Sequence, residues 1–189
     1  HHLPNTNVDE VMNGLKMCNK RIISDKYLSG GMGDGGGCHP RDNIALSWLS
    51  DELGLKFNWF DNIMKQREVQ TEWLADMIEK ESNGLPITIL GKSFKPQTNI
   101  TTGSPSILLS NILRERGLAV TMYDPYIDEP FADWQDMSEY DGVPQCYFIG
   151  TKHEDFVNFP FDDESIIIDP WRYIPDKEEC KVIRIGDNN

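Results

Sequence analysis

The chain has 189 residues, which is long enough to bury a core and to form one or two domains. Its 18 basic and 31 acidic side chains give a formal charge of -13, which argues against a nucleic-acid partner, because phosphate binding requires a basic surface. No apolar run reaches membrane-spanning length and no secretory signal is visible, so we expect a cytoplasmic protein without membrane contact.

The first predicted helix covers residues 7–19, with Asn7 as its candidate N-cap and Val8, Val11 and Leu15 on one face. Residues 21–37 then read as a loop that ends in glycines. The cysteines are far apart and form no CxxC pair, which indicates reduced thiols and neither a zinc nor a redox site. They are Cys18, Cys38, Cys146 and Cys180.

The most informative segment runs from Gly33 to Asp42 and reads Gly-Asp-Gly-Gly-Gly-Cys-His-Pro-Arg-Asp. Consecutive glycines let a backbone approach a ligand closely, and Pro40 is a favourable first residue for a helix. Cys38 therefore lies near a helix N-terminus, where partial positive charge favours the thiolate, and Asp42 follows one turn later. These are the parts of a covalent thioester site, whereas the alternative is a plain turn with a small buried cysteine.

Two helical stretches follow the cysteine. Residues 43–49 are expected to form the buried face of the helix that opens at Pro40, and Gly54 would end that helix. Residues 57–83 contain no proline or glycine and predict a long helix with a broad apolar stripe. Such a stripe fits core packing and a subunit interface equally well, and from it we predict a homodimer through this helix.

After Gly84 the pattern changes to short apolar strands separated by helices and turns. Strands are predicted at 87–90, 119–123, 146–149, 165–168 and 180–185, with a helix at 104–117 and a helical turn at 152–156. This alternation predicts an α/β fold in which a helical central segment is followed by a doubly wound, Rossmann-like parallel sheet. We place the domains at residues 1–83 and 84–189.

Ligands of such sheets bind at the carboxyl ends of the strands. Here those ends carry Lys92, Phe94, Lys95, Asp124, Asp169 and Arg172. The dinucleotide fingerprint GxGxxG is absent, because Gly91 is the lone glycine of the first loop. Lys95 is a candidate donor to a phosphate or a uracil-like ring, and the alternative is a solvated loop lysine.

These motifs resemble the UDP-glucose/GDP-mannose dehydrogenase family, from the end of its central region through its C-terminal nucleotide-sugar domain. The run from Gly33 to Asp42 is similar to the family's cysteine motif. Ile89 to Pro96, with Thr98 and Ser104-Pro105 beyond, is similar to the first strand and loop of the nucleotide-sugar domain, and Tyr123-Asp124-Pro125 matches its second strand end. The order and the intervals also fit over nearly the whole chain.

The resemblance implies an NAD-dependent oxidation of a UDP- or GDP-sugar in two hydride steps, from alcohol to aldehyde to acid. It implies that Cys38 traps the aldehyde and then carries a thioester, and that Asp42 assists its hydrolysis. It assigns cofactor contacts to Cys38 and Arg41. The implied substrate-binding residues are Arg21, Tyr27, Ser29, Gly33, Gly35, Phe94, Lys95 and Arg172.

This sequence also departs from the family pattern. Asp34 stands where an aromatic residue is usual, Arg41 replaces a lysine, and Thr102 and Trp171 occupy places where arginines are expected. The family's N-terminal GxGxxG domain is not in these residues, so we expect no hydride transfer by this chain alone. The alternatives are a non-catalytic sugar-nucleotide-binding and dimerisation module, and a cysteine acyl-transfer enzyme with His39 or His153 as its base.

Overall fold

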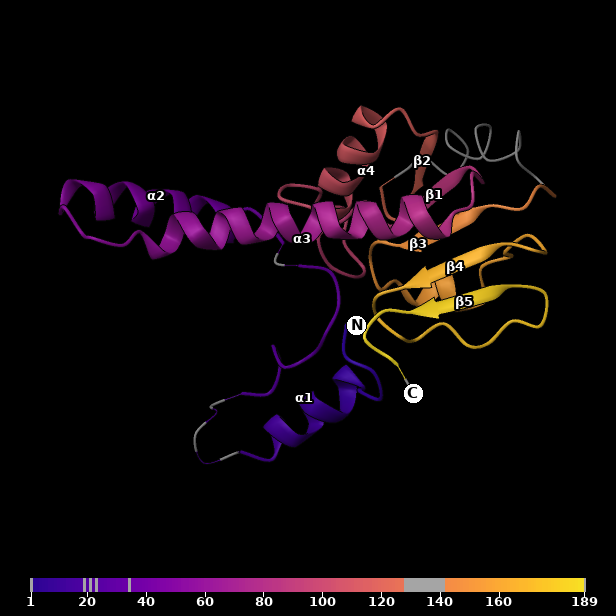
Figure 1. Ribbon diagram of the computed structural model, residues 1–189, viewed down its shortest axis with the longest axis horizontal. Helices are drawn as coiled ribbons and strands as arrows, with labels where there is room; N and C mark the ends of the chain where they lie inside the picture. The colour runs from indigo at the N-terminus through magenta and orange to yellow at the C-terminus, as the bar shows by residue number, and fades with distance from the viewer. Residues whose placement is uncertain are drawn as a thin grey trace.

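The N-terminal part of the protein is helical. The computed structural model describes residues 2–18, 20, 22, 24–33, 35–127 and 142–188. Helices α1 (Val8–Lys16), α2 (Cys38–Glu52) and α3 (Trp59–Glu81) precede the first strand. Figure 1 shows α2 and the first half of α3 projecting side by side from the sheet, and we call this pair the helical arm.

The C-terminal part is a parallel sheet whose described residues form five strands in the order β2-β1-β3-β4-β5. All four neighbouring pairs are parallel. The strands are β1 (Ile87–Leu90), β2 (Val120–Tyr123), β3 (Cys146–Ile149), β4 (Ile166–Asp169) and β5 (Lys181–Arg184), joined in part by α4 (Pro105–Glu115) and η1 (Glu154–Asn158). The predicted α/β class is confirmed, and the strand order reverses between β1 and β3.

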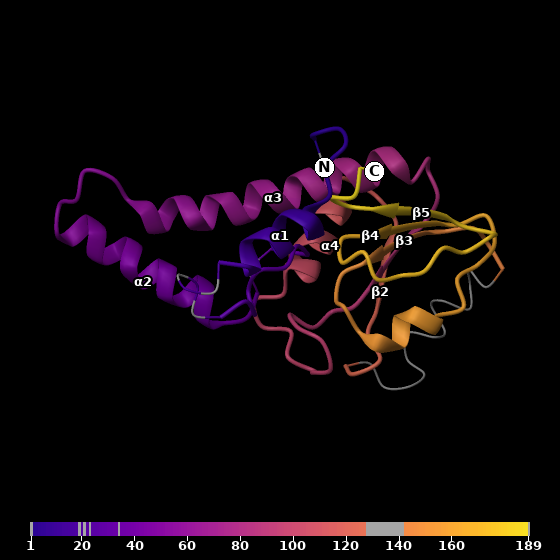
Figure 2. The ribbon, with the colours of Figure 1, turned by 90° about the horizontal axis from the view of Figure 1, so that it is seen from below.

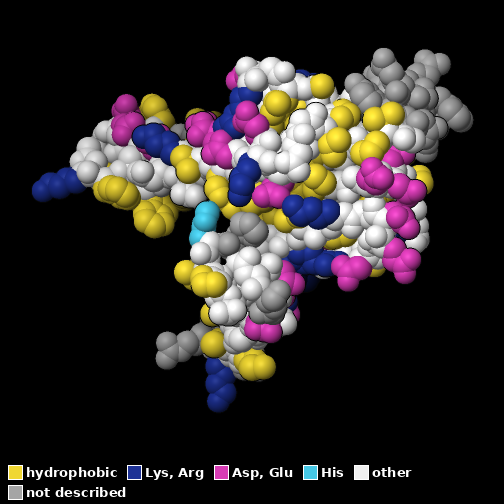
Figure 3. Space-filling model, turned by 45° about the vertical axis from the view of Figure 1, so that its right-hand side comes forward, with side chains coloured by type: hydrophobic (Ala, Val, Ile, Leu, Met, Phe, Trp, Pro, Cys, Tyr) yellow, Lys and Arg dark blue, Asp and Glu magenta, His cyan; other side chains and the backbone are white. Residues whose placement is uncertain are grey.

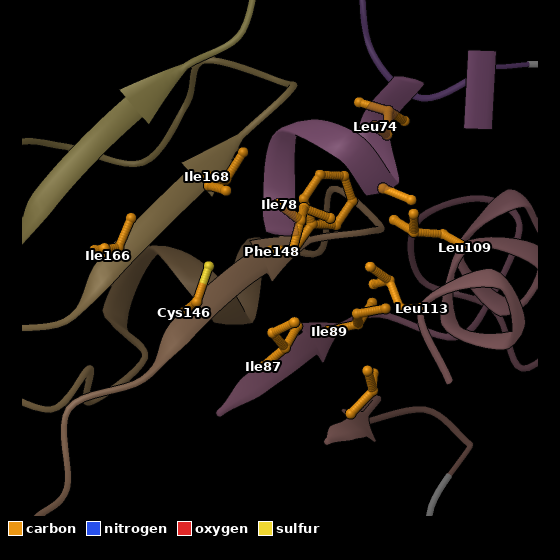
Figure 4. Close-up of a cluster of buried hydrophobic side chains, with 12 residues drawn as sticks. Leu74, Ile78, Ile87, Ile89, Leu109, Leu113, Cys146, Phe148, Ile166 and Ile168 are labelled. Atoms are coloured by element: carbon orange, nitrogen blue, oxygen red, sulfur yellow. The ribbon is translucent and has the colours of Figure 1, made fainter. Parts of the chain in front are cut away.

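Two apolar cores cover the two faces of this sheet. On one face Leu74 and Ile78 of α3 and Leu109 of α4 pack on the strands, as Figure 4 shows. On the other face Phe156 of η1 joins Tyr147, Ile149 and Ile167. Figure 2 accordingly places α3 and η1 on opposite sides of the sheet. Alternate strand residues point to opposite faces, so every central strand is buried on both sides.

Most predicted helix ends are confirmed. The Asn7 side chain accepts hydrogen bonds from the backbone N–H groups of Asp9 and Glu10, which caps α1. Pro105 is the first residue of α4, as predicted, and Asn58, which was not predicted as a cap, caps α3 through its side chain. The helix of the cysteine motif differs, because it begins at Cys38 and not at Pro40, with Gly37 as its N-cap.

The predicted buried face of residues 43–49 is wrong. Among the residues of α2, all of which are described, Ser50 is the one that is buried, while Ile44, Leu46, Trp48 and Leu49 are exposed. The physical reason is the position of α2, which contacts α3 within the arm and lies away from the strands in Figure 1. Figure 3 shows apolar side chains (yellow) at the surface of the arm.

The two ends of the described chain are tied together. The Val8 backbone N–H donates to the carbonyl of Gly186 at 2.8 Å, and that of Asn188 donates to the carbonyl of Thr6 at 3.0 Å. Helix α1 is thereby fixed next to β5 although the two are far apart in sequence. None of the helices in the described part of the chain is long and apolar enough to cross a membrane.

Candidate functional site

One cavity of about 800 Å³ lies where the glycine loop meets the carboxyl edge of the sheet. It brings together segments from three regions: the loop before α2, the middle of α3 and the loops after β1 and β4. Its lining residues are Lys26, Tyr27, Ser29, Gly30, Gly31, Met32, Gly33, Gly35, Gly36, Gly37, Cys38, His39, Gln70, Phe94, Lys95 and Trp171.

The cysteine loop is held against the sheet by close backbone packing. Gly36 has φ +88, and a Cβ added to it would lie 2.9 Å from the Phe94 ring. Its N–H donates to the carbonyl of Gly103 at 3.3 Å, and the Arg67 guanidinium on α3 donates to the same carbonyl at 2.7 Å. Cys38 follows as the exposed first residue of α2. Its thiol thus meets the positive end of a helix at the cavity wall.

Phe94 and Lys95 lie in the loop that leaves β1, and they form another wall of the cavity. The Lys95 ammonium lies 5.3 Å from the centre of the Phe94 ring. Such a pair presents an aromatic face together with a positive charge, which suits a base and a phosphate. Both residues were predicted from the sequence as ligands of a nucleotide sugar.

Two buried aspartates shape the carboxyl edge of the sheet. The Asp124 carboxylate, after β2, accepts hydrogen bonds from the backbone N–H groups of Lys92 and Ser93 at 2.7 and 2.9 Å. Burial acts to raise the pKa of Asp124, but the hydrogen bonds from His153 and from these and other N–H groups lower it to about 2. Asp169, the last residue of β4, accepts from the N–H groups of residues 171–174.

The structure brings most of the predicted residues together. Tyr27, Ser29, Gly33, Gly35, Cys38, Phe94 and Lys95 all line the cavity. Arg41 and Asp42 do not: their side chains pair with each other at 2.9 Å and are both exposed on α2. Arg21 lies outside the described residues, as does Asp34.

Arg172 lies behind the cavity wall, although the resemblance makes it a ligand of the substrate. Its guanidinium donates to both carboxylate oxygens of Asp9, at 2.7 and 2.9 Å, and to the carbonyl of Gly30 at 3.1 Å. The side chain is only 5% exposed, and its hydrogen bond lowers the pKa of Asp9. Its geometry is that of a clamp joining α1 and the glycine loop to β4, while its contact with substrate stays a prediction.

Several lining residues were not predicted. Trp171 follows the Asp-Pro pair that ends β4, so its position at a strand end was a usable signal. Gln70 lines the cavity from α3, and no sequence pattern distinguishes it from its neighbours on that helix. Lys26 adds a second cation next to Tyr27. Among the described residues no cluster of His, Cys, Asp or Glu has the arrangement of a metal site.

The fold and the cavity together define an α/β protein in which a cysteine-bearing glycine loop faces the carboxyl edge of a parallel sheet. Two family models match the chain: the central domain of the UDP-glucose/GDP-mannose dehydrogenase family over residues 2–68, and the UDP binding domain of the same family over residues 88–175. The chain therefore belongs to the UDP-glucose/GDP-mannose dehydrogenase family.

Two curated relatives illustrate the level of similarity. The UDP-glucose 6-dehydrogenase TuaD of Bacillus subtilis is 30% identical over 121 residues, which cover 62% of this chain and 26% of the relative. The GDP-mannose 6-dehydrogenase of Azotobacter vinelandii is 29% identical over 119 residues, which cover 63% of this chain and 27% of the relative. This chain therefore matches only about a quarter of the length of these relatives.

The solved structures agree in fold. A UDP-glucose dehydrogenase from the archaeon Pyrobaculum islandicum superposes with a TM-score of 0.73 at 23% identity, covering 94% of this chain and 43% of that one. The UDP-N-acetyl-mannosamine dehydrogenase Cap5O of Staphylococcus aureus superposes with a TM-score of 0.67 at 21% identity, covering 97% of this chain and 43% of that one.

Proposed function

We propose that this chain is the C-terminal portion of an NAD-dependent sugar-nucleotide 6-dehydrogenase, which oxidises a UDP- or GDP-sugar to the uronic acid. The observation that carries the proposal is that Cys38, Phe94 and Lys95 line one and the same cavity. The aromatic ring suits a base, and the lysine with the glycine-loop amides suits a diphosphate. The sugar would then lie toward the cysteine.

Cys38 is the residue to which we assign the covalent chemistry. Its thiolate would attack the aldehyde carbon of the oxidised sugar, forming a C–S bond and an alkoxide on the former carbonyl oxygen. Bound NAD would supply the two-electron oxidation that separates this adduct from the thioester, and water would then cleave the thioester, releasing the acid and restoring the thiol. Asp42 lies one turn along α2 from Cys38 and is our candidate for assisting that hydrolysis, although its present partner is Arg41.

The loop after β1 does not fit NAD. In dinucleotide-binding folds the backbone amides of this turn hold the pyrophosphate. Here the N–H groups of Lys92 and Ser93 donate to the Asp124 carboxylate instead. We therefore assign no contact with NAD to this loop, and Cys38 and Arg41 remain the contacts with NAD that the family resemblance predicts.

The assembly and compartment are also proposals. We propose a homodimer through the long helix 57–83, supported by the exposed apolar residues of the arm that it shares with α2. The described residues include all four cysteines, and all are free, which favours a reducing compartment such as the cytoplasm. We keep the domain division at residues 83 and 84. A non-catalytic binding and dimerisation module is the alternative function.

Titration with UDP-glucose and GDP-mannose by calorimetry tests the proposal. We expect the isolated chain to bind weakly, with a Kd on the order of 0.1–1 mM, and to produce no NADH. Lys95→Ala should weaken binding about tenfold because a charged partner of the phosphates is lost. Lys56→Ala removes the same charge from an exposed site outside the cavity and is the matched control.

Two results would contradict the proposal. One is the absence of binding to either sugar nucleotide at several millimolar. The other is an equal affinity of the Lys95→Ala variant and the wild-type chain. The binding-module alternative predicts the same affinities, so it is distinguished by Cys38→Ala, which should abolish oxidation by a complete enzyme that contains this segment.

A further inference from the structure

A fully buried histidine lies beneath the loop that carries Phe94 and Lys95. His153 follows β3, and its imidazole is 0% exposed. The Tyr126 ring stacks on it with centroids 4.7 Å apart, and Phe156 meets it edge-on at 5.4 Å. This histidine does not line the cavity. A buried polar ring of this kind is retained only where its nitrogens have partners.

Both ring nitrogens of His153 contact the residues of that loop or the aspartate below it. Nδ1 accepts a hydrogen bond from the backbone N–H of Gln97 at 3.1 Å. Nε2 lies 3.2 Å from the Asp124 carboxylate and 3.1 Å from the Ser93 hydroxyl. An Nδ1 that accepts is unprotonated, so the ring proton resides on Nε2, where the carboxylate is its natural acceptor.

The loop is therefore fastened at two ends. At its start Asp124 accepts from the N–H groups of Lys92 and Ser93. At its far end Gln97 has φ +54, a left-handed conformation that costs energy for a residue other than glycine. The hydrogen bond to His153 stabilises that conformation. Phe94 and Lys95 lie between the two attachments.

We propose that His153 is a positioning residue of the nucleotide-sugar cavity, which acts through Gln97 to hold Phe94 and Lys95 in place. The inference rests on the proposed function for its ligand. The acceptor at Nδ1 is the essential feature, because the start of the loop is held by Asp124, by the Thr151 hydroxyl on the Ser93 carbonyl and by the Nε2 side of the ring, none of which reaches Gln97. Without the acceptor at Nδ1 the Gln97 N–H loses its partner. Phe94 and Lys95 are then no longer held in a fixed position at the cavity.

Two substitutions distinguish the roles of the two ring nitrogens of His153. His153→Asn places an amide oxygen near the position of Nδ1 and keeps the acceptor for Gln97. His153→Gln places its amide near the position of Nε2 and loses that acceptor. Hydrogen exchange of the folded protein should be about tenfold faster at the Gln97 amide in the glutamine variant and near wild type in the asparagine variant. The amides of Lys92 and Ser93 should stay protected in both variants.

The affinity for UDP-glucose or GDP-mannose should follow the same order. We expect a loss of about tenfold in the glutamine variant and of less than about threefold in the asparagine variant. Equal losses in both variants, or no change in exchange at Gln97, would overturn the proposal. If the wild-type chain binds no sugar nucleotide, the proposed function fails, and the exchange measurement still decides the role of His153.

A measurement on the wild-type protein needs no variant. Nitrogen NMR of the His153 imidazole should report an unprotonated Nδ1 and a protonated Nε2 at neutral pH. The opposite tautomer would place a hydrogen between Nδ1 and the Gln97 N–H and would overturn the proposal. This result is independent of ligand binding and of the stability of any substituted protein.

Discussion

Cys38 differs from the other cysteines in its surroundings. It is exposed at the first residue of α2, whereas Cys146 is buried in β3 and Cys180 is half-buried before β5. Burial raises the pKa of Cys146 to about 12, and it also raises the pKa of Cys180. A thiol reacts as its thiolate, so both of these cysteines should be slow nucleophiles.

We predict that iodoacetamide labels Cys38 much faster than Cys146 or Cys180 at neutral pH, as measured by peptide mapping of the folded protein. Cys18 is the comparison, because it is also exposed but directly follows the C-terminal end of α1, where partial negative charge disfavours the thiolate. A rate for Cys38 above that of Cys18 is therefore the order expected for thiols at opposite helix ends. Faster labelling of Cys146 or Cys180 than of Cys38 would refute the prediction.

Asp124 should make the protein sensitive to acid. Its pKa in the folded state is about 2, below the value of 3.8 for an ordinary aspartate. A lowered folded pKa stabilises the fold above pH 4, and the stabilisation is lost as the pH falls from about 4 to about 2. At neutral pH it amounts to about 2 kcal/mol in the free energy of unfolding.

The test compares Asp124→Asn with wild type by urea unfolding between pH 7 and pH 2. The variant should be less stable by about 2 kcal/mol at pH 7, and the difference should shrink toward pH 2. Glu72→Gln removes a carboxylate from an exposed position on α3 and should leave the curve unchanged. A difference that persists to pH 2 would mean that packing, and not ionisation, carries the effect.

At the scale of single residues, the sequence predicted which residues share the cavity better than it predicted the partners of individual side chains. The glycine run, Phe94 and Lys95 could be chosen because glycine, aromatic and cationic side chains have recognisable uses near strand ends. The ion pair between Arg172 and Asp9 could not be predicted, because the two residues are far apart in sequence and meet only in the folded protein. A side chain's partner is a tertiary property, whereas its chemical capacity is local.

At the scale of elements, the strands were predicted accurately because parallel strands buried on both faces are short continuous apolar runs. The buried face assigned to α2 failed for a related reason. Apolar periodicity indicates that a helix face meets something, but it does not say whether that surface belongs to the same chain. In the arm, much of the apolar surface of α2 has no partner among the described residues.

At the scale of elements, the close contact between Gly103 and Gly36 leaves no room for an added methyl group. Gly103 has φ +70, and a Cβ added there would lie 2.4 Å from the carbonyl oxygen of Gly36. This contact joins the loop before α4 to the cysteine loop. Arg67 donates to the carbonyl of Gly103 as well, so a shift of this loop is felt by α3.

We predict that Gly103→Ala costs more stability than Gly117→Ala and alters the labelling rate of Cys38. Gly117 is the matched control, because it has φ +82 but no atom within 4 Å of an added Cβ. It should report only the backbone cost, about 1 kcal/mol. Equal unfolding free energies for the two variants, with unchanged Cys38 labelling, would contradict a role for this contact.

At the scale of the whole molecule, packing within a single chain does not explain the exposed apolar side chains of the helical arm. Trp48 of α2 is 63% exposed, and Phe57 and Trp59 at the turn into α3 are 62% and 63% exposed. Large aromatic side chains bury on the order of 150–250 Å² each when they find a partner. A surface with several of them, on helices that extend away from the sheet, has the character of an interface.

We predict a dimer at micromolar concentration, because two copies of the arm related by a twofold axis would cover each other's apolar residues. Light scattering should give twice the chain mass for the wild type. Trp48→Lys with Trp59→Lys should give a monomer, since each lysine would place an unpaired charge in the interface. Val143→Lys, on an exposed loop outside the arm, is the control and should remain dimeric. A monomeric wild type, or a dimer that persists in the double variant, would show that the arm does not join two copies of this chain.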